Sequence, residues 1–220
     1  DNGFAIIGST TAEELIIAIA PKNRSSYKST YLDTANTLCS ALKENNSIRR
    51  LVYLSSTSVY GDRNGEWTSE EELLNPISEN GKILSETEEV YLKKFQSNVS
   101  ITILRLAGLY GPGRSHESRI KRLSGSSLPG TGEEFSNWVH QEDVVRAIDW
   151  VLKNQLNGVY NICCDDHPTK KEFYDSISNG MKLSKVNWDI SKVSLRKGNK
   201  RISNSKIKKT GFSFLHSSTE

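Results

Sequence analysis

The chain has 220 residues, of which 35% are hydrophobic and 25% charged, and its formal net charge is +3. This is enough apolar material for one large domain, or for one domain with a smaller lobe. The sequence has no apolar run of about 18 residues, so we expect no transmembrane helix.

The first half of the chain alternates between strand and helix patterns. Residues 15–20 are a continuous apolar run closed by Pro21, which is typical of a strand buried on both faces of a parallel sheet. Apolar residues at helical spacing over 27–42 predict a helix. Residues 50–55 form a second predicted strand. A polar loop separates this strand from a predicted helix over 80–95.

The second half continues the alternation. Residues 100–106 and 158–163 are predicted strands, and residues 142–152 form a predicted helix between them. Thr169 and Glu172 have the spacing of a capping box, so another helix should begin there. The sequence therefore predicts an α/β fold with a doubly wound, mainly parallel sheet that is covered by helices on both faces.

The N-terminus and the cysteines indicate the origin of the chain. Asp1-Asn2-Gly3-Phe4 has neither an initiator Met nor the basic start of a secretory signal, so we expect the chain to begin partway through a longer gene product. Cys39, Cys163 and Cys164 make a poor disulfide framework, which favours a reducing, cytoplasmic location. Neighbouring strand residues point to opposite faces, so we interpret Cys163-Cys164 as plain strand residues and predict no metal site.

The positive charge is concentrated at the C-terminal end. From Lys182 onward there are 10 Lys or Arg against 2 Asp or Glu. Such a segment can meet nucleic acid or a phosphorylated ligand. It lacks the regular interleaving of aromatic side chains that a base-stacking platform needs. We therefore favour a solvated basic surface, and we expect neither nucleic acid nor a membrane as a partner.

Five stretches carry distinctive motifs, at residues 51–61, 104–113, 137–144, 158–162 and 200–212. The first reads LVYLSSTSVYG, the second LRLAGLYGPG and the third NWVHQEDV. In this order they resemble the extended short-chain dehydrogenase/reductase family, also called the NAD-dependent epimerase/dehydratase family. The first stretch is similar to an atypical, YeeZ-like branch. The resemblance implies a Rossmann-like fold, with a C-terminal helix over 200–212.

The sequence departs from this family at the phosphate-binding turn. The family holds the dinucleotide pyrophosphate with a Gly-rich turn after its first strand, where backbone N–H groups face the phosphates. Gly3 and Gly8 do not have the required spacing. We therefore expect the first strand–helix units of the family to be missing from this chain.

The second departure is at the catalytic residues. The resemblance places the family's Ser or Thr at Ser56, and its Tyr-x-x-x-Lys segment on Asn80 and Leu84. An amide cannot serve as a phenolate, and Leu84 fits the apolar stripe of the helix. Lys82 lies about 200° around the helix from Asn80, so it should face away from the site. Tyr60 or His140 would then have to handle the proton, although His140 could instead organise the turn before the next helix.

The resemblance implies NAD or NADP as cofactor and a small, sugar-like substrate. Ligands of such sheets sit beyond the carboxyl ends of the strands. Ser56 and Asn80 stand at the catalytic positions, and Arg114, Trp138 and His140 are expected on the substrate side. The expected cofactor-binding residues are Ala20, Pro21, Leu54, Ser55, Leu106, Ala107 and Gly108.

Two functions stay open at this point. One is an NAD(P)-dependent oxidoreductase or epimerase, and the other is a non-catalytic dinucleotide-binding sensor or interaction module, which accounts directly for the replaced Tyr and Lys. In both, residues 1–110 and 141–163 would form the nucleotide-binding domain, and residues 111–140 and 164–220 the substrate-binding lobe. The helices at 26–46 and 80–96 match the helices through which this family often forms homodimers.

Overall fold

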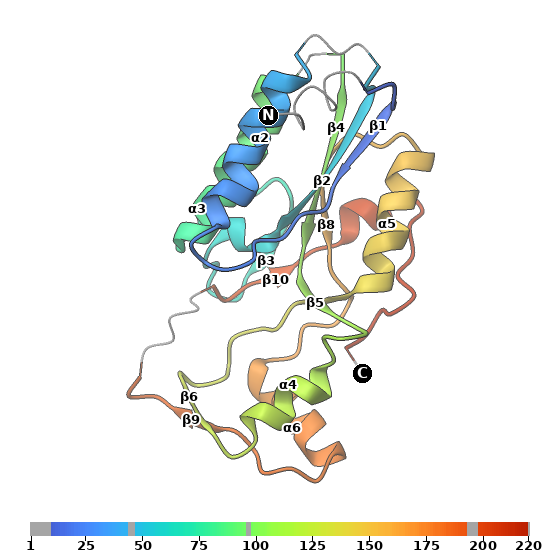
Figure 1. Ribbon diagram of the computed structural model, residues 1–220. Helices are drawn as coiled ribbons and strands as arrows, with labels where there is room; N and C mark the ends of the chain where they lie inside the picture. The colour runs from blue at the N-terminus through green and yellow to red at the C-terminus, as the bar shows by residue number, and fades with distance from the viewer. Residues whose placement is uncertain (1–9, 44–46, 96–97, 193–197, 220) are drawn as a thin grey trace.

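The computed structural model describes residues 10–43, 47–95, 98–192 and 198–219. Predictions on the N-terminus, on Gly3 and Gly8, and on the last residues of the ranges 26–46 and 80–96 fall outside them. A parallel sheet with the strand order β1-β2-β4-β8 forms the centre of the molecule (Figure 1). Its strands are β1 (Glu14–Ile17), β2 (Arg50–Ser56), β4 (Ser100–Leu106) and β8 (Gly158–Ile162). The predicted α/β fold is confirmed.

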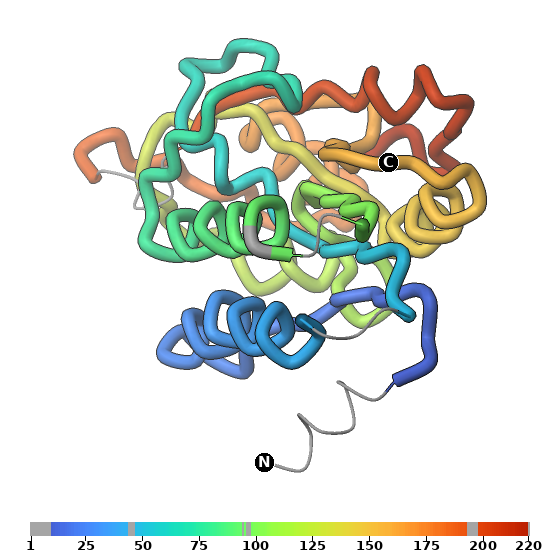
Figure 2. Tube along the Cα trace, turned by 90° about the horizontal axis from the view of Figure 1, so that it is seen from above, coloured from blue at the N-terminus to red at the C-terminus, as the bar shows by residue number. Residues whose placement is uncertain are grey.

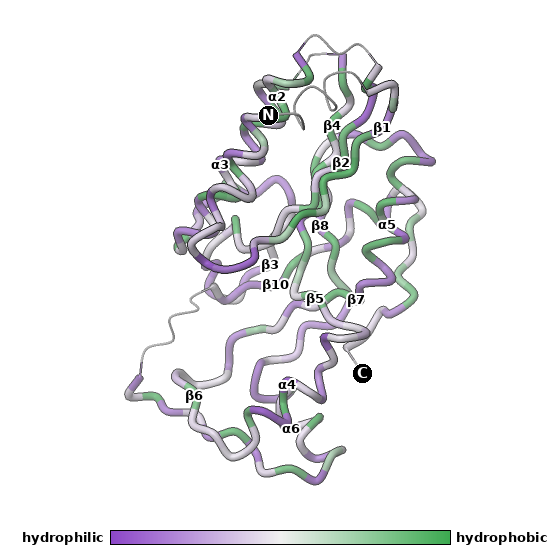
Figure 3. Tube along the Cα trace, viewed as in Figure 1, coloured by the Kyte–Doolittle hydropathy of each residue, from purple (hydrophilic) through white to green (hydrophobic). Residues whose placement is uncertain are grey.

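Helices cover both faces of the sheet. The π-helical turn η1 (Ser29–Asp33), α2 (Thr34–Ala41) and α3 (Glu79–Lys94) lie on one face. Helix α5 (Gln141–Lys153) lies on the other face (Figures 1 and 2). The helix predicted over 27–42 is therefore divided into η1 and α2. Apolar residues concentrate along the strands (Figure 3), because each central strand is covered by helices on two sides.

The first strand is shorter and more exposed than its apolar sequence predicts. Pairing of β1 with β2 ends at Ile17, and Ile16 keeps 46% of its surface exposed. The prediction of a strand over 15–20 that is buried on both faces is therefore wrong for this chain. The physical reason is that β1 is the edge of the described sheet, with β2 as its neighbour on one side.

A smaller lobe lies below the carboxyl ends of the strands (Figure 1). It contains α4 (His116–Leu123), α6 (Lys170–Gly180), and the parallel pair of β6 (Ser127–Pro129) and β9 (Asn187–Asp189). Thr169 and Glu172 form the predicted capping box of α6. The lobe has a hydrophobic cluster separate from the main core, consisting of Ile120, Phe173, Tyr174 and Val186.

The C-terminal helix expected over 200–212 is wrong. The chain forms β10 (Arg201–Ile202), which pairs with β3 (Trp67–Thr68), and then the single turn α7 (Ser205–Lys208). Pairing with β3 takes the backbone N–H and C=O groups that a helix would use itself. No described helix is long and apolar enough to cross a membrane.

The cysteine pair lies just beyond β8 rather than in it, so the interpretation as strand residues is wrong. Both thiols are buried, and none of the three cysteines, all of which lie in the described part of the chain, forms a disulfide. The backbone leaves the sheet after Ile162, because the Cys164 N–H donates to the Trp138 carbonyl oxygen of another segment at 2.8 Å. Burial raises the pKa of the Cys163 thiol, which disfavours the reactive thiolate.

Candidate functional site

Parallel strands bring their carboxyl ends to one edge of the sheet. Ser56, the last residue of β2, pairs directly with Leu106, the last residue of β4. The short strands β5 (Gly108–Tyr110) and β7 (Trp138–His140) continue beyond this edge and pair with each other. The strand-end residues predicted from the sequence therefore meet the segment predicted for the substrate side.

The Ser56 hydroxyl is oriented by the turn that follows β2. This turn, η2 (Thr57–Tyr60), begins with Ser56 as N-cap, whose Oγ accepts the Ser58 backbone N–H at 3.2 Å. A serine hydroxyl has one proton besides its two lone pairs. Accepting one hydrogen bond therefore leaves the Ser56 O–H as a donor for a substrate oxygen at a half-buried position.

The end of the same turn is held from the C-terminal part of the chain. Gly61 has a φ of +72°, and the Asn75 carbonyl oxygen occupies the place that a Cβ would take. The Lys200 Nζ donates to the Gly61 carbonyl oxygen at 2.8 Å and is buried, which lowers the pKa of Lys200 to about 8. The interpretation of the basic segment as solvated surface is therefore wrong for Lys200.

The start of α3 lies against the Ser56 turn. Gly81, next to Asn80, packs so close to the Ser58 carbonyl oxygen that a Cβ on Gly81 would stand 3.1 Å from it. Asn80 is half-buried, whereas Lys82 is exposed and lies 3.9 Å from the Glu79 carboxylate. Leu84 is 2% exposed and belongs to the core. The predicted orientations of Lys82 and Leu84 are confirmed, and the approach of Asn80 to Ser56 stays a prediction.

Tyr60 lies in a buried network below the site. Its hydroxyl accepts from Arg105 Nη1 at 2.8 Å and donates to Asn161 Oδ1 at 2.7 Å. Arg105 also pairs with Glu88, whose Oε1 accepts from the Ser55 hydroxyl at 2.5 Å. Burial raises the pKa of Tyr60 to about 12. This network occupies the Tyr60 hydroxyl, so Tyr60 is poorly placed to carry a proton to or from a ligand.

Several expected cofactor contacts have other partners here. The Ala107 N–H donates to the Ile162 carbonyl oxygen at 3.0 Å, and the Gly108 N–H to the Asn137 carbonyl oxygen at 2.9 Å. The Ser55 hydroxyl is bound to Glu88. A ligand at these strand ends would therefore meet carbonyl groups and side-chain surfaces. Leu54 and Pro21 are half-buried and Ala20 is exposed, three residues beyond β1.

The substrate-side residues are placed by the β5–β7 pair. Gly108 lies opposite Trp138, and Tyr110 opposite His140. A Cβ on Gly108 would stand 2.6 Å from the Trp138 ring, so glycine permits this close approach. His140 is the N-cap of α5, because its Nδ1 accepts the Glu142 N–H at 3.3 Å. Its proposed role in organising the turn therefore has a structural basis.

Arg114 lies in the loop that follows β5. Its side chain is exposed, and its backbone N–H closes a turn with the Gly111 carbonyl oxygen at 2.9 Å. His116, which the sequence did not single out, lies among the rings of the β5–β7 pair. It is 6% exposed, and its ring stacks on Tyr110 at 4.2 Å between centroids and contacts Trp138 at 4.6 Å. Burial lowers the pKa of His116 to about 4.

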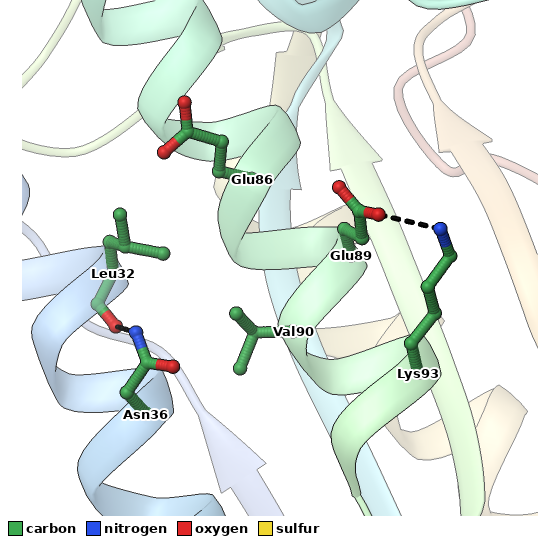
Figure 4. A pocket seen from close by; sticks show the side chains of 6 residues that line it. All are labelled: Leu32, Asn36, Glu86, Glu89, Val90 and Lys93. Carbon is green, nitrogen blue, oxygen red and sulfur yellow. Dashed lines mark hydrogen bonds and ion pairs between the residues drawn. The ribbon is translucent and has the colours of Figure 1, made fainter.

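A depression lies away from this edge, between η1–α2 and α3 (Figure 4). Asn36, Glu86, Glu89 and Lys93 place polar groups around it, and Leu32 and Val90 add apolar surface. These are the helices expected to form a homodimer contact. The homodimer stays a prediction, and the charged residues here indicate that such a contact would contain ion pairs as well as apolar packing.

A central parallel sheet covered by helices on both faces places the chain in the Rossmann-like class of α/β proteins. A model of the NAD dependent epimerase/dehydratase family matches residues 17–163. The chain belongs to this family, as the sequence motifs predicted. The cofactor class predicted from the sequence, NAD or NADP, agrees with the family.

Among curated relatives, the chain is 38% identical to Protein YeeZ of Escherichia coli K12 over 169 residues, which are 76% of this chain and 58% of YeeZ. The similarity to the YeeZ-like branch is thereby confirmed. It is also 28% identical over 144 residues to the dTDP-D-glucose 4,6-dehydratase of Dictyostelium discoideum, covering 56% of this chain and 33% of that enzyme. The chain thus spans little more than half of YeeZ.

Solved structures share the fold at low sequence identity. The human epimerase family protein SDR39U1 with NADPH has a TM-score of 0.80 and 13% identity, covering 99% of this chain and 82% of that one. MoeE5 in complex with UDP-glucuronic acid and NAD has a TM-score of 0.77 and 21% identity, covering 95% of this chain and 77% of that one. These likenesses establish the fold.

Proposed function

We propose that the chain forms the strand-end part of the active site of a dinucleotide-dependent oxidoreductase or epimerase acting on a small, sugar-like substrate. The Ser56 hydroxyl carries this proposal. It stands at the end of β2, opposite Leu106 of β4, and its O–H is left to donate to a substrate oxygen. A bound sugar nucleotide in MoeE5 and the name of the Dictyostelium enzyme support the substrate class.

The same edge would hold the nicotinamide end of NAD or NADP. When bound, that ring supplies or accepts the hydride. The residues that fit it lie at successive strand ends and offer carbonyl groups and apolar surface. Ser56 would orient the substrate oxygen, and Trp138 and His140 would bound the substrate on its far side. The residues proposed to contact the cofactor are Ala20, Pro21, Leu54, Ser55, Leu106, Ala107 and Gly108.

A second function is favoured by one observation. The Tyr60 hydroxyl is bound to Arg105 and Asn161, and Leu84, which the sequence motif aligns with the family Lys, is buried in the core. A site whose nearby tyrosine hydroxyl is already bound suits a non-catalytic dinucleotide sensor or interaction module. In that alternative the strand ends bind the cofactor, and the smaller lobe meets a ligand or partner that is not transformed.

Measuring whether the protein turns over a substrate distinguishes these two functions. The assay follows NADH and NADPH absorbance with UDP- and dTDP-linked sugars, because substrates of this kind match the proposed class. We expect Ser56→Ala to lower kcat by at least about tenfold, since removing one hydrogen-bond donor aimed at a reacting oxygen costs roughly 10²–10³-fold. Ser58→Ala is the matched control, because Ser58 is exposed and acts on Ser56 only through its backbone N–H. Cofactor binding without turnover of any substrate would support the sensor instead.

The affinity of the chain for NAD(H) or NADP(H) tests the proposed position of the cofactor. The described residues include those proposed to contact the nicotinamide end of the cofactor, but they include no Gly-rich turn for its phosphates. Each charge-assisted phosphate hydrogen bond is worth roughly 1.5–3 kcal/mol, and about 1.4 kcal/mol is tenfold in affinity. We therefore expect these 220 residues to bind NAD(H) or NADP(H) at best in the millimolar range, and a longer form carrying a Gly-rich turn to bind at micromolar levels. Micromolar binding by the 220 residues in calorimetric titration would contradict this placement.

A further inference from the structure

Three side chains of types that can ligate a metal ion meet at the start of α5, and they come from two distant segments. His140 and Glu142 belong to the α5 N-terminus, and His216 belongs to the segment after α7. The His216 Nε2 lies 3.0 Å from Glu142 Oε2, and His140 Nδ1 lies 4.0 Å from the same oxygen. One ligand atom of each residue lies within 4.8 Å of the others. We propose that His140, Glu142 and His216 bind one divalent transition-metal ion, with Zn²⁺ as the best match.

The donor set and the spacing fit this ion. Two imidazole nitrogens and one carboxylate oxygen are common zinc ligands, with bonds of about 2.0–2.2 Å. Donor atoms around a tetrahedral ion with such bonds lie roughly 3.3 Å apart. The two distances to Glu142 Oε2, 3.0 and 4.0 Å, bracket this value, and all three ligand atoms lie within 4.8 Å of one another, so rotation of the side chains would bring them around one ion. Glu142 and His216 are 53% and 35% exposed, which leaves a fourth position to water.

The backbone brings His216 to the site independently of its side chain. The buried Asp143 carboxylate accepts the Leu215 N–H at 2.7 Å and the His216 N–H at 2.9 Å. Arg146 donates to Asp143 at 2.8 Å and to the Ser213 carbonyl oxygen at 2.9 Å. The C-terminal segment is therefore attached to α5 next to the ligands, which reduces the conformational entropy lost on metal binding.

The ring of His140 presents the nitrogen that the site needs. A Cβ on Gly111 would stand 2.9 Å from His140 Nε2, so this nitrogen faces the Gly111 loop and Nδ1 faces Glu142. The Nδ1 lone pair accepts the Glu142 N–H in a long hydrogen bond of 3.3 Å, which a metal ion would replace. The positive end of the helix dipole opposes a cation here, and the Glu142 carboxylate compensates for it.

A bound ion would fasten the C-terminal segment to the wall of the substrate side. The His140 ring contacts Tyr110 at 5.0 Å between centroids and His216 at 3.8 Å. The Tyr110 hydroxyl donates to the Ser218 carbonyl oxygen of the same segment at 3.1 Å. The proposed role is therefore structural. The ion ties residues near the end of the chain to the β5–β7 pair.

The test is a calorimetric titration of the tag-free chain with Zn²⁺, together with the visible absorption of added Co²⁺. We expect one ion per chain, a higher Tm with Zn²⁺, and at least a tenfold loss of affinity in His216→Ala and in Glu142→Gln. Losing an outer partner of a metal ligand already costs about 10–100-fold, and losing a ligand costs more. The matched controls are His167→Gln, a histidine outside the cluster, and Asp149→Asn, an exposed carboxylate further along α5.

Each outcome has one meaning. Saturable binding that both controls retain and both cluster variants lose supports the site, provided that circular dichroism finds the variants folded. Absence of saturable binding by the wild-type chain overturns the proposal. Equal affinity in wild type and His216→Ala also overturns it, because the His216–Glu142 contact would then be only a hydrogen bond. If His216→Ala does not fold, Glu142→Gln and the Co²⁺ spectrum decide.

Discussion

The buried Glu88–Arg105 pair below Ser55 and Tyr60 offers a quantitative test of the fold around the site. Glu88 and Arg105 have side-chain exposures of 2% and 5%, and Arg105 Nη2 lies 2.7 Å from Glu88 Oε2. Arg105 Nε lies 3.2 Å from both carboxylate oxygens. Glu88→Gln removes the negative charge while keeping the size and shape of the side chain. It leaves the Arg105 cation buried without a counter-charge.

The expected cost follows from this burial. Removing one partner of a buried ion pair destabilises proteins by roughly 3–5 kcal/mol, because the other charge stays desolvated. A domain of this size has a total stability of about 5–15 kcal/mol, so Glu88→Gln should be folded but markedly weakened. Arg105→Leu should cost a similar amount. The double variant should lose less than the sum of the two, since neither charge is then left unpaired.

The assay is urea unfolding of the four forms, and α3 supplies the control. Glu89 pairs with Lys93 one turn apart on the same helix, but their side chains are 59% and 72% exposed. Exposed pairs of this kind contribute only about 0.3–0.5 kcal/mol, so Glu89→Gln should change the unfolding free energy little. A loss below about 1 kcal/mol in Glu88→Gln, or strict additivity in the double variant, would mean that the buried Arg105 charge does not depend on Glu88.

Three further predictions concern pH, a turn and a cap. Burial lowers the pKa of His116 to about 4 from 6.5, so the unfolded chain takes up this proton first as pH falls. His116 should therefore reduce stability progressively from pH 6.5 to about 4, and His116→Gln should flatten the pH profile of Tm in that window. Gly61→Ala places a Cβ against the Asn75 carbonyl group and should lower the free energy of unfolding in urea by roughly 2–6 kcal/mol. Gly113 has a similar φ but open space around it, so Gly113→Ala should lower this free energy by only about 1–2 kcal/mol. Similar losses in these two variants would contradict the clash. Thr169→Ala removes the α6 capping box and should cost about 1 kcal/mol by the same assay; no loss would mean that the cap is replaced by water.

Local patterns in the sequence determined most of the architecture. The strand at 100–106, the α3 stripe that buries Leu84, and the capping box at Thr169 follow from periodicity and short-range hydrogen bonding, which the sequence displays directly. The motif order likewise determined the family and its expected strand-end site. These features depend on residues that lie close together in the chain.

The tertiary structure decided features that join distant residues. Whether residues 15–20 are buried depends on the strands that flank them, and here β1 is the edge of the described sheet. Lys200 lies in a basic segment, yet it is buried on Gly61, 139 residues away. His216 meets Glu142 where Asp143 accepts hydrogen bonds from the C-terminal segment. Such contacts carry no local periodicity, so only the packing of the whole chain determines them.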